Sequence, residues 1–203
     1  NKKEFLNITR KSKLYIFQEY EVFWGGFSQV QVEIYLFEKA HALKYDYYHL
    51  ISGADLPLKS NKEIDAFFEQ HRGTEFILYD EDKLKNDPEI TRRAKYYHFL
   101  QNYRRRYTQK WKNGFFTFLE RVSLVAQIVF RVNRVKNLDW TIKYGSQWVS
   151  ITDDLVTQIL KQKDKIQRVF SCTNCADELF VQTVAYNCGF KNKIYAPECG
   201  RAE

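Results

Sequence analysis

The sequence predicts an α/β fold, with a mixed central sheet flanked by helices and interrupted by a helical, basic insertion. Runs rich in β-branched and aromatic residues alternate with amphipathic helical runs, a rhythm that is typical of α/β layers. Glycine turns separate several of these runs. The 203 residues, 44% of them hydrophobic and 17% aromatic, are enough to bury one core. We therefore expect residues 1–203 to form a single domain.

The alternation begins near the N-terminus. Residues 13–22 (KLYIFQEYEV) favour a strand, which ends at the turn Trp24-Gly25-Gly26. Ser28 is expected to cap a helix that runs to about residue 44. The buried stripe expected for this helix is Val30, Ile34, Phe37 and His41.

A strand and a capped helix come next. Residues 47–51 (YYHLI) predict a short strand. Residues 59–72 predict a helix that begins at Ser60 or Asn61, with Glu63 in position to complete a capping box.

A strand at residues 76–79 precedes a long insertion, residues 80–136, that breaks the alternation. The insertion is helical, basic and aromatic, and it contains Arg104-Arg105-Arg106. Residues 115–132 are apolar beyond one narrow stripe, so this helix should either be buried on two sides or meet a membrane. The core-facing positions expected from helical spacing are Phe115, Phe118, Leu119, Val122, Val125, Val129 and Val132.

After the insertion the alternation resumes. A strand at residues 138–143 leads to the turn Gly145-Ser146-Gln147-Trp148, and Thr152 is expected to cap a helix over residues 153–163. The remaining expected elements are a strand at residues 168–171, a helix at about residues 176–187 and a strand at residues 193–195.

Candidate binding residues lie where the expected strands end, because loops and helix N-termini converge at the carboxyl ends of strands. In Ser52-Gly53-Ala54-Asp55, the glycine permits close backbone approach, and the carboxylate could bind a ribose, a sugar hydroxyl or a cation. The alternative is that Asp55 only closes a turn before Pro57. The residues alone leave both interpretations open.

An acid pair, Asp177-Glu178, is the candidate for proton transfer. Acids in a first helical turn are favoured by the helix dipole, which alone could account for Asp177. Glu178 follows an expected strand end, where a carboxylate can accept a proton from an attacking hydroxyl. The histidines are poorly placed for that role; they are His41, His49, His71 and His98.

The cysteines suggest ordinary thiols. Cys172 and Cys175 have the spacing of half a zinc site or of a redox pair, but a second close pair and a nearby histidine are missing. We therefore expect reduced, buried thiols and no bound metal.

Four ordered blocks resemble the core-2/I-branching β-1,6-N-acetylglucosaminyltransferase family, also called glycosyltransferase family 14. Residues 47–60 (YYHLISGADLPLKS) are similar to its LSG-x-D-x-P-L-K signature. The Trp-Gly-Gly turn at residues 24–26, the GSQW turn at residues 145–148 and DELFVQT at residues 177–183 match its other blocks in order. The family usually has proline where this chain has Ala176, and the acid pair itself is kept.

The resemblance implies a GT-A-like fold and an inverting transfer, without metal or other cofactor, from a UDP-sugar to a glycan hydroxyl. The sugar would be N-acetylglucosamine, or xylose as in the xylosyltransferase branch, and Glu178 would be the base. Arg93, in a charged stretch loosely similar to an acceptor-contacting segment, is assigned to acceptor binding. The donor- and acceptor-binding positions expected with it are Trp24, Gly25, Gly26, Ser52, Gly53, Asp55, Ser146, Trp148 and Asp177.

Two segments of the family are not found in the sequence. One is a first nucleotide-binding strand. The other is a C-terminal basic segment that stabilises the departing diphosphate; either Arg201 begins this segment or the segment is missing from the sequence. With the lack of methionine, this predicts a glycosyltransferase domain that is incomplete at both ends.

Other functions compete with this interpretation. The net charge of +7 favours anionic partners, and Arg104-Arg105-Arg106 among tyrosines would also suit a nucleic-acid-binding module. No recognised nucleic-acid motif accompanies that cluster, so nucleic acid is not an expected partner. A relative that binds glycan without transferring it is the other alternative.

The expected partners are therefore a UDP-sugar donor and a glycan or lipid-linked glycan acceptor, with peripheral membrane contact through residues 104–136. The sparse cysteines and short blocks favour a bacterial polysaccharide enzyme in the cytoplasm, at the inner face of the membrane. A Golgi lumenal enzyme is the eukaryotic alternative.

Overall fold

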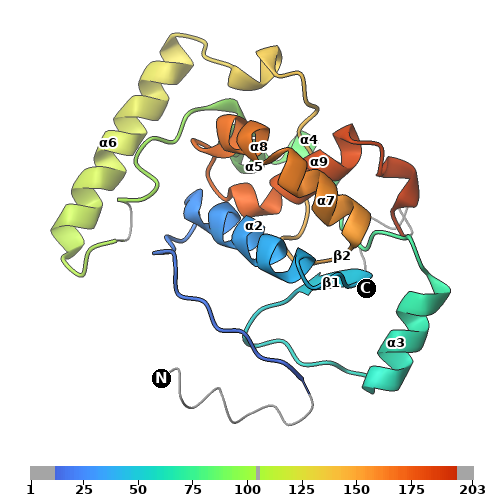
Figure 1. Cartoon of the computed structure of the whole chain (residues 1–203). Coiled ribbons are helices and arrows are strands. Elements are labelled where there is room, and N and C mark those ends of the chain that lie inside the picture. The colour runs from blue at the N-terminus through green and yellow to red at the C-terminus, as the bar shows by residue number, and fades with distance from the viewer. Residues whose placement is uncertain (1–11, 104–105, 196–203) are drawn as a thin grey trace.

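The computed structural model describes residues 12–103 and 106–195, which form an α/β structure with many helices around a small sheet (Figure 1). The class is the one predicted, whereas the GT-A-like arrangement stays a prediction. The helices are α2 (Ser28–His41), α3 (Asn61–Gln70), α4 (Glu81–Asn86), α5 (Pro88–Lys95), α6 (Lys110–Val129), α7 (Asp153–Lys161), α8 (Lys163–Phe170) and α9 (Phe180–Asn187). The strands are β1 (Tyr47–Leu50) and β2 (Val149–Thr152), and short 3-10 helices lie at η1 (Arg134–Asn137), η2 (Ala176–Glu178) and η3 (Lys191–Lys193).

The sheet is narrow and mixed in direction. Strands β1 and β2 pair in antiparallel register over their full lengths. Isolated bridges extend the pairing, with Phe76 antiparallel to Ser150 and Glu75 parallel to Ile194. Strand β2 therefore lies between β1 and the chain at residue 76. The strand predicted at residues 76–79 is reduced to these bridges, and β2 itself was not predicted as a strand.

One buried acid, Glu75, joins three parts of the chain at this sheet. Its carboxylate accepts hydrogen bonds from the Thr152 hydroxyl (2.5 Å) and the Thr152 backbone N–H (2.9 Å). Its backbone N–H donates to the Lys193 carbonyl (2.7 Å), and its carbonyl accepts from Tyr195 N–H (2.9 Å). Burial raises the pKa of Glu75. The predicted capping role of Thr152 is also confirmed, since its hydroxyl accepts from Leu155 N–H at the start of α7.

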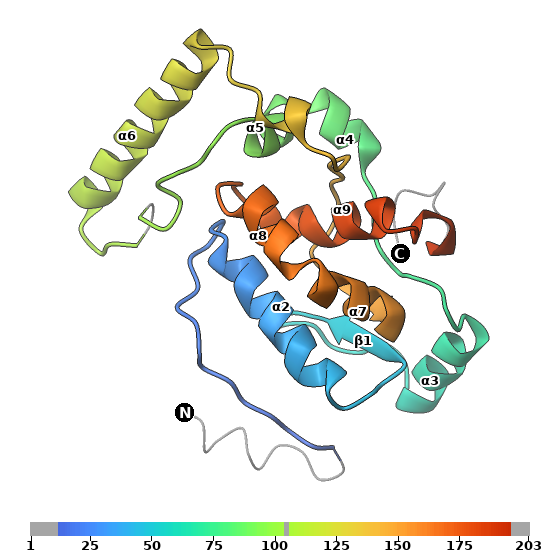
Figure 2. The ribbon, with the colours of Figure 1, turned by 45° about the horizontal axis from the view of Figure 1, so that its top comes forward.

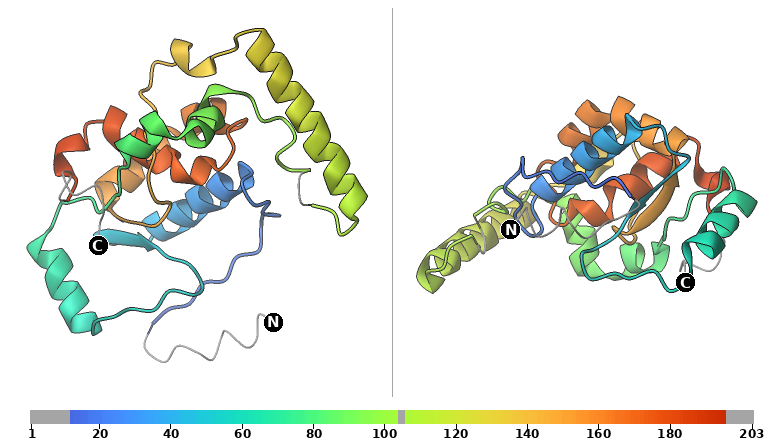
Figure 3. Two further views of the ribbon diagram at one scale, coloured as in Figure 1. Left: turned by 180° about the vertical axis from the view of Figure 1, so that it is seen from behind. Right: turned by 60° about the horizontal axis from the view of Figure 1, so that its bottom comes forward.

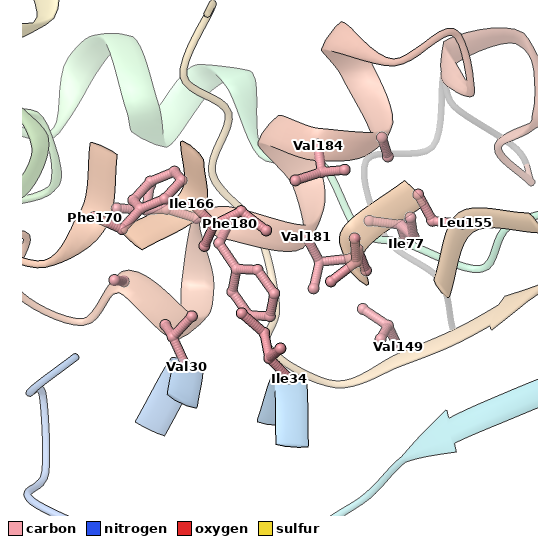
Figure 4. Close-up of a cluster of buried hydrophobic side chains, with 14 of the residues drawn as sticks. Val30, Ile34, Ile77, Val149, Leu155, Ile166, Phe170, Phe180, Val181 and Val184 are labelled. Atoms are coloured by element: carbon pink, nitrogen blue, oxygen red, sulfur yellow. The ribbon is translucent and has the colours of Figure 1, made fainter. Parts of the chain in front are cut away.

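The core lies between α2, the sheet and the C-terminal helices (Figure 4). The predicted stripe of α2 is confirmed for Val30, Ile34 and Phe37, which are buried, while His41 is partly exposed and contacts Asp153 (2.8 Å). Figure 4 also labels Ile77, which follows the bridge at Phe76, and buried residues of the C-terminal half, namely Val149, Leu155, Ile166, Phe170, Phe180, Val181 and Val184.

Of the helix caps predicted at Ser60 and Ser28, the first is present and the second is not. The capping box of α3 is present as predicted, with Ser60 accepting from Glu63 N–H and the Glu63 carboxylate accepting from Ser60 N–H. The predicted cap at Ser28 is wrong, because Ser28 lies inside α2 and its hydroxyl accepts a hydrogen bond from the Phe23 backbone N–H at 2.8 Å.

Three predicted strands are wrong. Residues 13–22 pack on α2 through rings, Phe17 and Tyr20 both contacting Tyr35, and join no strand within the described chain. In residues 138–143, the backbone N–H of Lys143 donates to the Thr183 hydroxyl of α9 instead of to a neighbouring strand. Residues 168–171 fall at the end of α8, whose buried Ile166, Val169 and Phe170 have helical spacing. The strand predicted at residues 193–195 consists of one bridge after η3.

The insertion at residues 80–136 is helical, as predicted, and its longest helix lies at the edge of the molecule. Helices α6 and α3 occupy opposite ends in every view (Figures 1 to 3). The predicted core-facing side of α6 is wrong: Phe115, Phe118, Val122, Val125 and Val129 are each at least half exposed, and Leu119 and Val132 are only partly buried. Within the described residues, no helix combines the length and apolar content needed to span a bilayer.

Candidate active site

The predicted glycine turn is linked to the predicted acid pair through Gln29 and Cys175. Gly25 has φ of +73°, a conformation that favours glycine. Its carbonyl accepts a hydrogen bond from Cys175 N–H (2.9 Å), and its own N–H donates to the Gln29 side-chain oxygen. The Gln29 amide in turn donates to Oδ2 of Asp177 (3.1 Å). The start of α2 therefore fixes the segment that carries the acids.

Glu178 is held through both its side chain and its backbone. Arg93 of α5 places Nη1 2.6 Å from Oε2 of Glu178, and the Gly145 backbone N–H donates to the Glu178 carbonyl (3.0 Å). The Glu178 side chain remains 32% exposed, while Arg93 is 18% exposed. The insertion thus supplies a largely buried arginine, Arg93, which pairs with Glu178. The Glu178 carboxylate itself remains accessible from solvent.

The GSQW turn packs tightly against two other segments. A Cβ atom on Gly145 would lie 1.8 Å from the Leu78 carbonyl oxygen, so the backbones meet where only glycine fits. The Gln182 side-chain amide donates to the Ser146 carbonyl, and the Tyr79 hydroxyl donates to the Gln182 carbonyl (3.0 Å). Residues 78–79, the turn and α9 therefore form one rigid junction beside Glu178.

Two acids near the site, Asp177 and Glu33, are buried. Burial, and then the neighbouring Glu178, raise the pKa of Asp177 to about 6. Burial, and then Asp177, raise the pKa of Glu33 to about 9. Among the described residues, Oδ1 of Asp177 and Oε2 of Glu33 have no hydrogen-bond partner. Near neutral pH Glu33 is therefore protonated in the folded protein.

The raised pKa of Glu33 predicts a stability that falls as the pH rises. The unfolded chain ionises Glu33 near pH 4.5 and the folded protein near pH 9, so the stabilisation is complete below pH 4.5 and is lost towards pH 9. Each pH unit in this window costs about 1.4 kcal/mol per group. Glu33→Gln keeps a neutral side chain of the same shape. At pH 8, about 3.5 units above the unfolded value, we expect its free energy of unfolding to exceed that of wild type by up to about 5 kcal/mol. The two proteins should be nearly equal at pH 5.

Urea unfolding of both proteins at pH 5 and pH 8 measures this difference. Glu38→Gln, on the same helix, is the matched control, because Glu38 pairs with Lys163 at the surface and the pKa of Glu38 is lowered by that contact. An unchanged pH dependence in Glu33→Gln would rule out a protonated Glu33.

The other predicted positions are placed differently. Ser52 and Asp55 bond to each other, with Ser52 N–H 2.6 Å from Oδ2 of Asp55, and no hydrogen bond or ion pair joins this exposed loop to Glu178 within the described chain. The turn-closing interpretation of Asp55 thus describes its observed contacts. Trp24 is 65% exposed and Trp148 43% exposed, so neither is a core residue. Arg201 and the first two residues of the Arg104–Arg106 cluster lie outside the described residues.

Sequence reasoning missed residues that hold the acid pair and the GSQW turn in place. Gln29 and Gln182 had signals: Gln29 follows the glycine turn by one helical turn, and Gln182 follows Glu178 by the four residues that share a helix face. The pairing of Arg93 with Glu178 had none, since their separation is 85 residues. Within the described chain, no three His, Cys, Asp or Glu side chains gather closely enough to hold a metal ion.

A separate hollow lies away from the acid pair. It measures about 550 Å³ and is lined by the face of α5 that carries Thr91, Ala94 and Lys95, opposite Arg93, and by apolar residues such as Trp140 and Ile142. Its walls contain neither acid of the pair. The candidate site is therefore assigned from the contacts of Glu178 and not from the size of a cavity.

The glycine turns and an arginine ion pair thus hold a partly exposed carboxylate, a group that can accept a proton from a hydroxyl. The family model described as Core-2/I-branching enzyme matches residues 9–199, a span that contains every block assembled above. The chain belongs to this family and is thereby a glycosyltransferase, with a sugar donor and a glycan acceptor. A search of curated proteins gave no match.

Proposed function

We propose that this protein transfers a sugar, N-acetylglucosamine in the first instance, from a UDP-sugar to a hydroxyl group of a glycan, with inversion and without a metal. The observation that supports it best is the position of Glu178, a partly exposed carboxylate fixed by Arg93 at 2.6 Å and by the Gly145 backbone at 3.0 Å. A base must be held within hydrogen-bond reach of the hydroxyl that it deprotonates, and these contacts hold it.

The reaction would be a single displacement. The acceptor hydroxyl oxygen forms a bond to the anomeric carbon while the bond from that carbon to the UDP oxygen breaks, and the hydroxyl proton passes to Glu178. In the described contacts Arg93 engages Oε2 of Glu178, which leaves Oε1 to take the proton. Attack from the face opposite UDP inverts the anomeric configuration. Basic side chains would stabilise the departing diphosphate.

The remaining predicted site residues are proposed to surround these two reactants. Asp177 and the Gly25-Gly26 turn share one hydrogen-bonded network, and Ser146 lies in the turn whose Gly145 holds Glu178. Trp24 and Trp148 offer exposed rings that can stack on a sugar or on uracil. Ser52, Gly53 and Asp55 belong to the exposed loop after β1, where they would meet substrate only from the solvent side.

UDP release in the presence of EDTA tests this proposal. The chain is incubated with single UDP-sugars, including UDP-N-acetylglucosamine and UDP-xylose, and with glycan acceptors. We expect turnover with one donor, and we expect EDTA to leave its rate unchanged. Turnover that EDTA abolishes would contradict only the metal independence and would leave the proposed sugar transfer standing. Glycan binding without UDP release or UDP binding would instead identify a non-catalytic relative.

A further inference from the structure

Helix α6 packs on the protein through polar side chains. Its two buried residues are Glu120 and Gln127, which lie two helical turns apart and so share one face. The Glu120 carboxylate contacts Nδ1 of His98 (2.8 Å) and accepts from Leu100 N–H (3.2 Å). The Gln127 side chain bonds to both backbone groups of Tyr97, at 2.8 Å and 2.9 Å.

The opposite face of α6 is apolar and exposed. Its members recur at alternating intervals of four and three residues, which places them on one stripe about 30 Å long. These exposed side chains are Trp111, Phe115, Phe118, Val122, Val125 and Val129, and each is 50% to 70% exposed. Figures 1 and 2 show α6 at the periphery, apart from α2, α8 and α9. The helix therefore presents to solvent the side that a core helix would bury.

The charges beside this stripe have one sign. Lys110 and Arg121 lie along one border, Lys112 lies near the other, and Arg131 follows the end of the helix. Glu120 is the one acid between residues 110 and 131, and it is buried against the protein. A surface that combines an aromatic and aliphatic stripe with basic borders is complementary to lipid with negatively charged headgroups.

We propose that α6 (Lys110–Val129) lies flat in the headgroup region of an anionic membrane, with the Trp111 to Val129 stripe turned towards the acyl chains. Basic borders favour this partner over a second copy of the chain, because packing two stripes face to face would bring their lysines and arginines together. The hydrogen bonds of the buried Glu120 and Gln127 side chains fix the orientation of α6, since they turn the stripe away from the protein. The proposal does not depend on the transferase activity.

Vesicle sedimentation of the 203-residue chain tests this proposal. We expect the partition coefficient to be at least about tenfold higher for vesicles of phosphatidylcholine mixed with phosphatidylserine than for phosphatidylcholine alone. Phe118→Ser combined with Val122→Ser should lower binding to the mixed vesicles about tenfold or more. Lys110→Glu combined with Arg121→Glu should remove the preference for anionic lipid. Circular dichroism checks that every variant is folded.

A matched control uses exposed leucines elsewhere. Leu56 and Leu58 are 83% and 95% exposed in the loop after β1, and Leu56→Ser combined with Leu58→Ser should bind vesicles as wild type does. Equal binding to both kinds of vesicle, or to neither, would overturn the proposal, as would α6 variants that bind normally. A concentration-dependent dimer that the α6 variants abolish, in a protein that ignores vesicles, would show that the stripe is a contact between copies.

Discussion

Glu178→Gln is expected to lower kcat by about 10² to 10⁴, the usual contribution of a positioned general base. Glutamine keeps the length of the side chain, and its oxygen can still accept from Arg93, which lies 2.6 Å from Oε2 in the wild type. The amide cannot take the acceptor proton near neutral pH, so the loss should fall on kcat and leave the donor KM nearly unchanged. UDP release with the preferred donor measures both constants.

The control for this variant is Glu69→Gln. Glu69 forms an ion pair with Arg72 at the same distance of 2.6 Å, but on the exposed surface of α3. Removing that charge should change neither kcat nor thermal stability appreciably, because exposed pairs contribute little. If Glu178→Gln kept its activity to within a factor of three, Glu178 would not be the base.

Gly145→Ala should destabilise the protein by more than about 3 kcal/mol, because the added methyl group would overlap the backbone of residue 78. Its Cβ would lie 1.8 Å from the Leu78 carbonyl oxygen, and that neighbour is backbone rather than a flexible side-chain end. For a chain of this size, such a loss lowers Tm by roughly 6 to 12 °C. The backbone must also shift where Gly145 N–H bonds to the Glu178 carbonyl, so kcat should fall with stability.

Gly114→Ala is the matched control for thermal unfolding. Gly114 lies within α6 and an added Cβ meets nothing within 4 Å. Alanine in a helix interior is favoured over glycine by about 0.5 to 1 kcal/mol, so this variant should be equal to or slightly more stable than wild type. Equal Tm values for Gly145→Ala and wild type would show that the junction is looser than its contacts imply.

The features that sequence predicted best depend on residues close together in the chain. The α3 capping box needs only Ser60 and Glu63, and the Thr152 cap needs only the residues after it. Residues 168–171 were misassigned because four residues cannot distinguish a strand from the end of a helix, whereas the spacing from Ile166 can. For α6, apolar spacing located the stripe correctly but could not tell which side faces the protein, since polar clamps to residues 97–100 decide it.

The candidate site divides in the same way. Ordered motifs predicted that the Trp-Gly-Gly turn, the Ser52–Asp55 loop, the GSQW turn and Glu178 belong together. Hydrogen bonds connect the two turns to Glu178, the first of them through Cys175. Within the described residues, no hydrogen bond connects the Ser52–Asp55 loop to Glu178. The ion pair between Arg93 and Glu178 was not predictable, because Arg93 lies on an insertion helix 85 residues earlier in the chain. Such contacts follow from how the elements pack, which no local pattern encodes.

The links made by the sheet also govern when this chain can fold during synthesis. Strand β1 must wait for β2, since His49 meets Ser150 only after 101 more residues, and Glu75 finds its backbone partners only at Lys193 and Tyr195. At about 5 to 20 residues per second, the first of these delays alone lasts roughly 5 to 20 s. The apolar side of α2 is uncovered during that time. The nascent chain therefore keeps this side of α2 exposed at least until residues 149–152 have emerged.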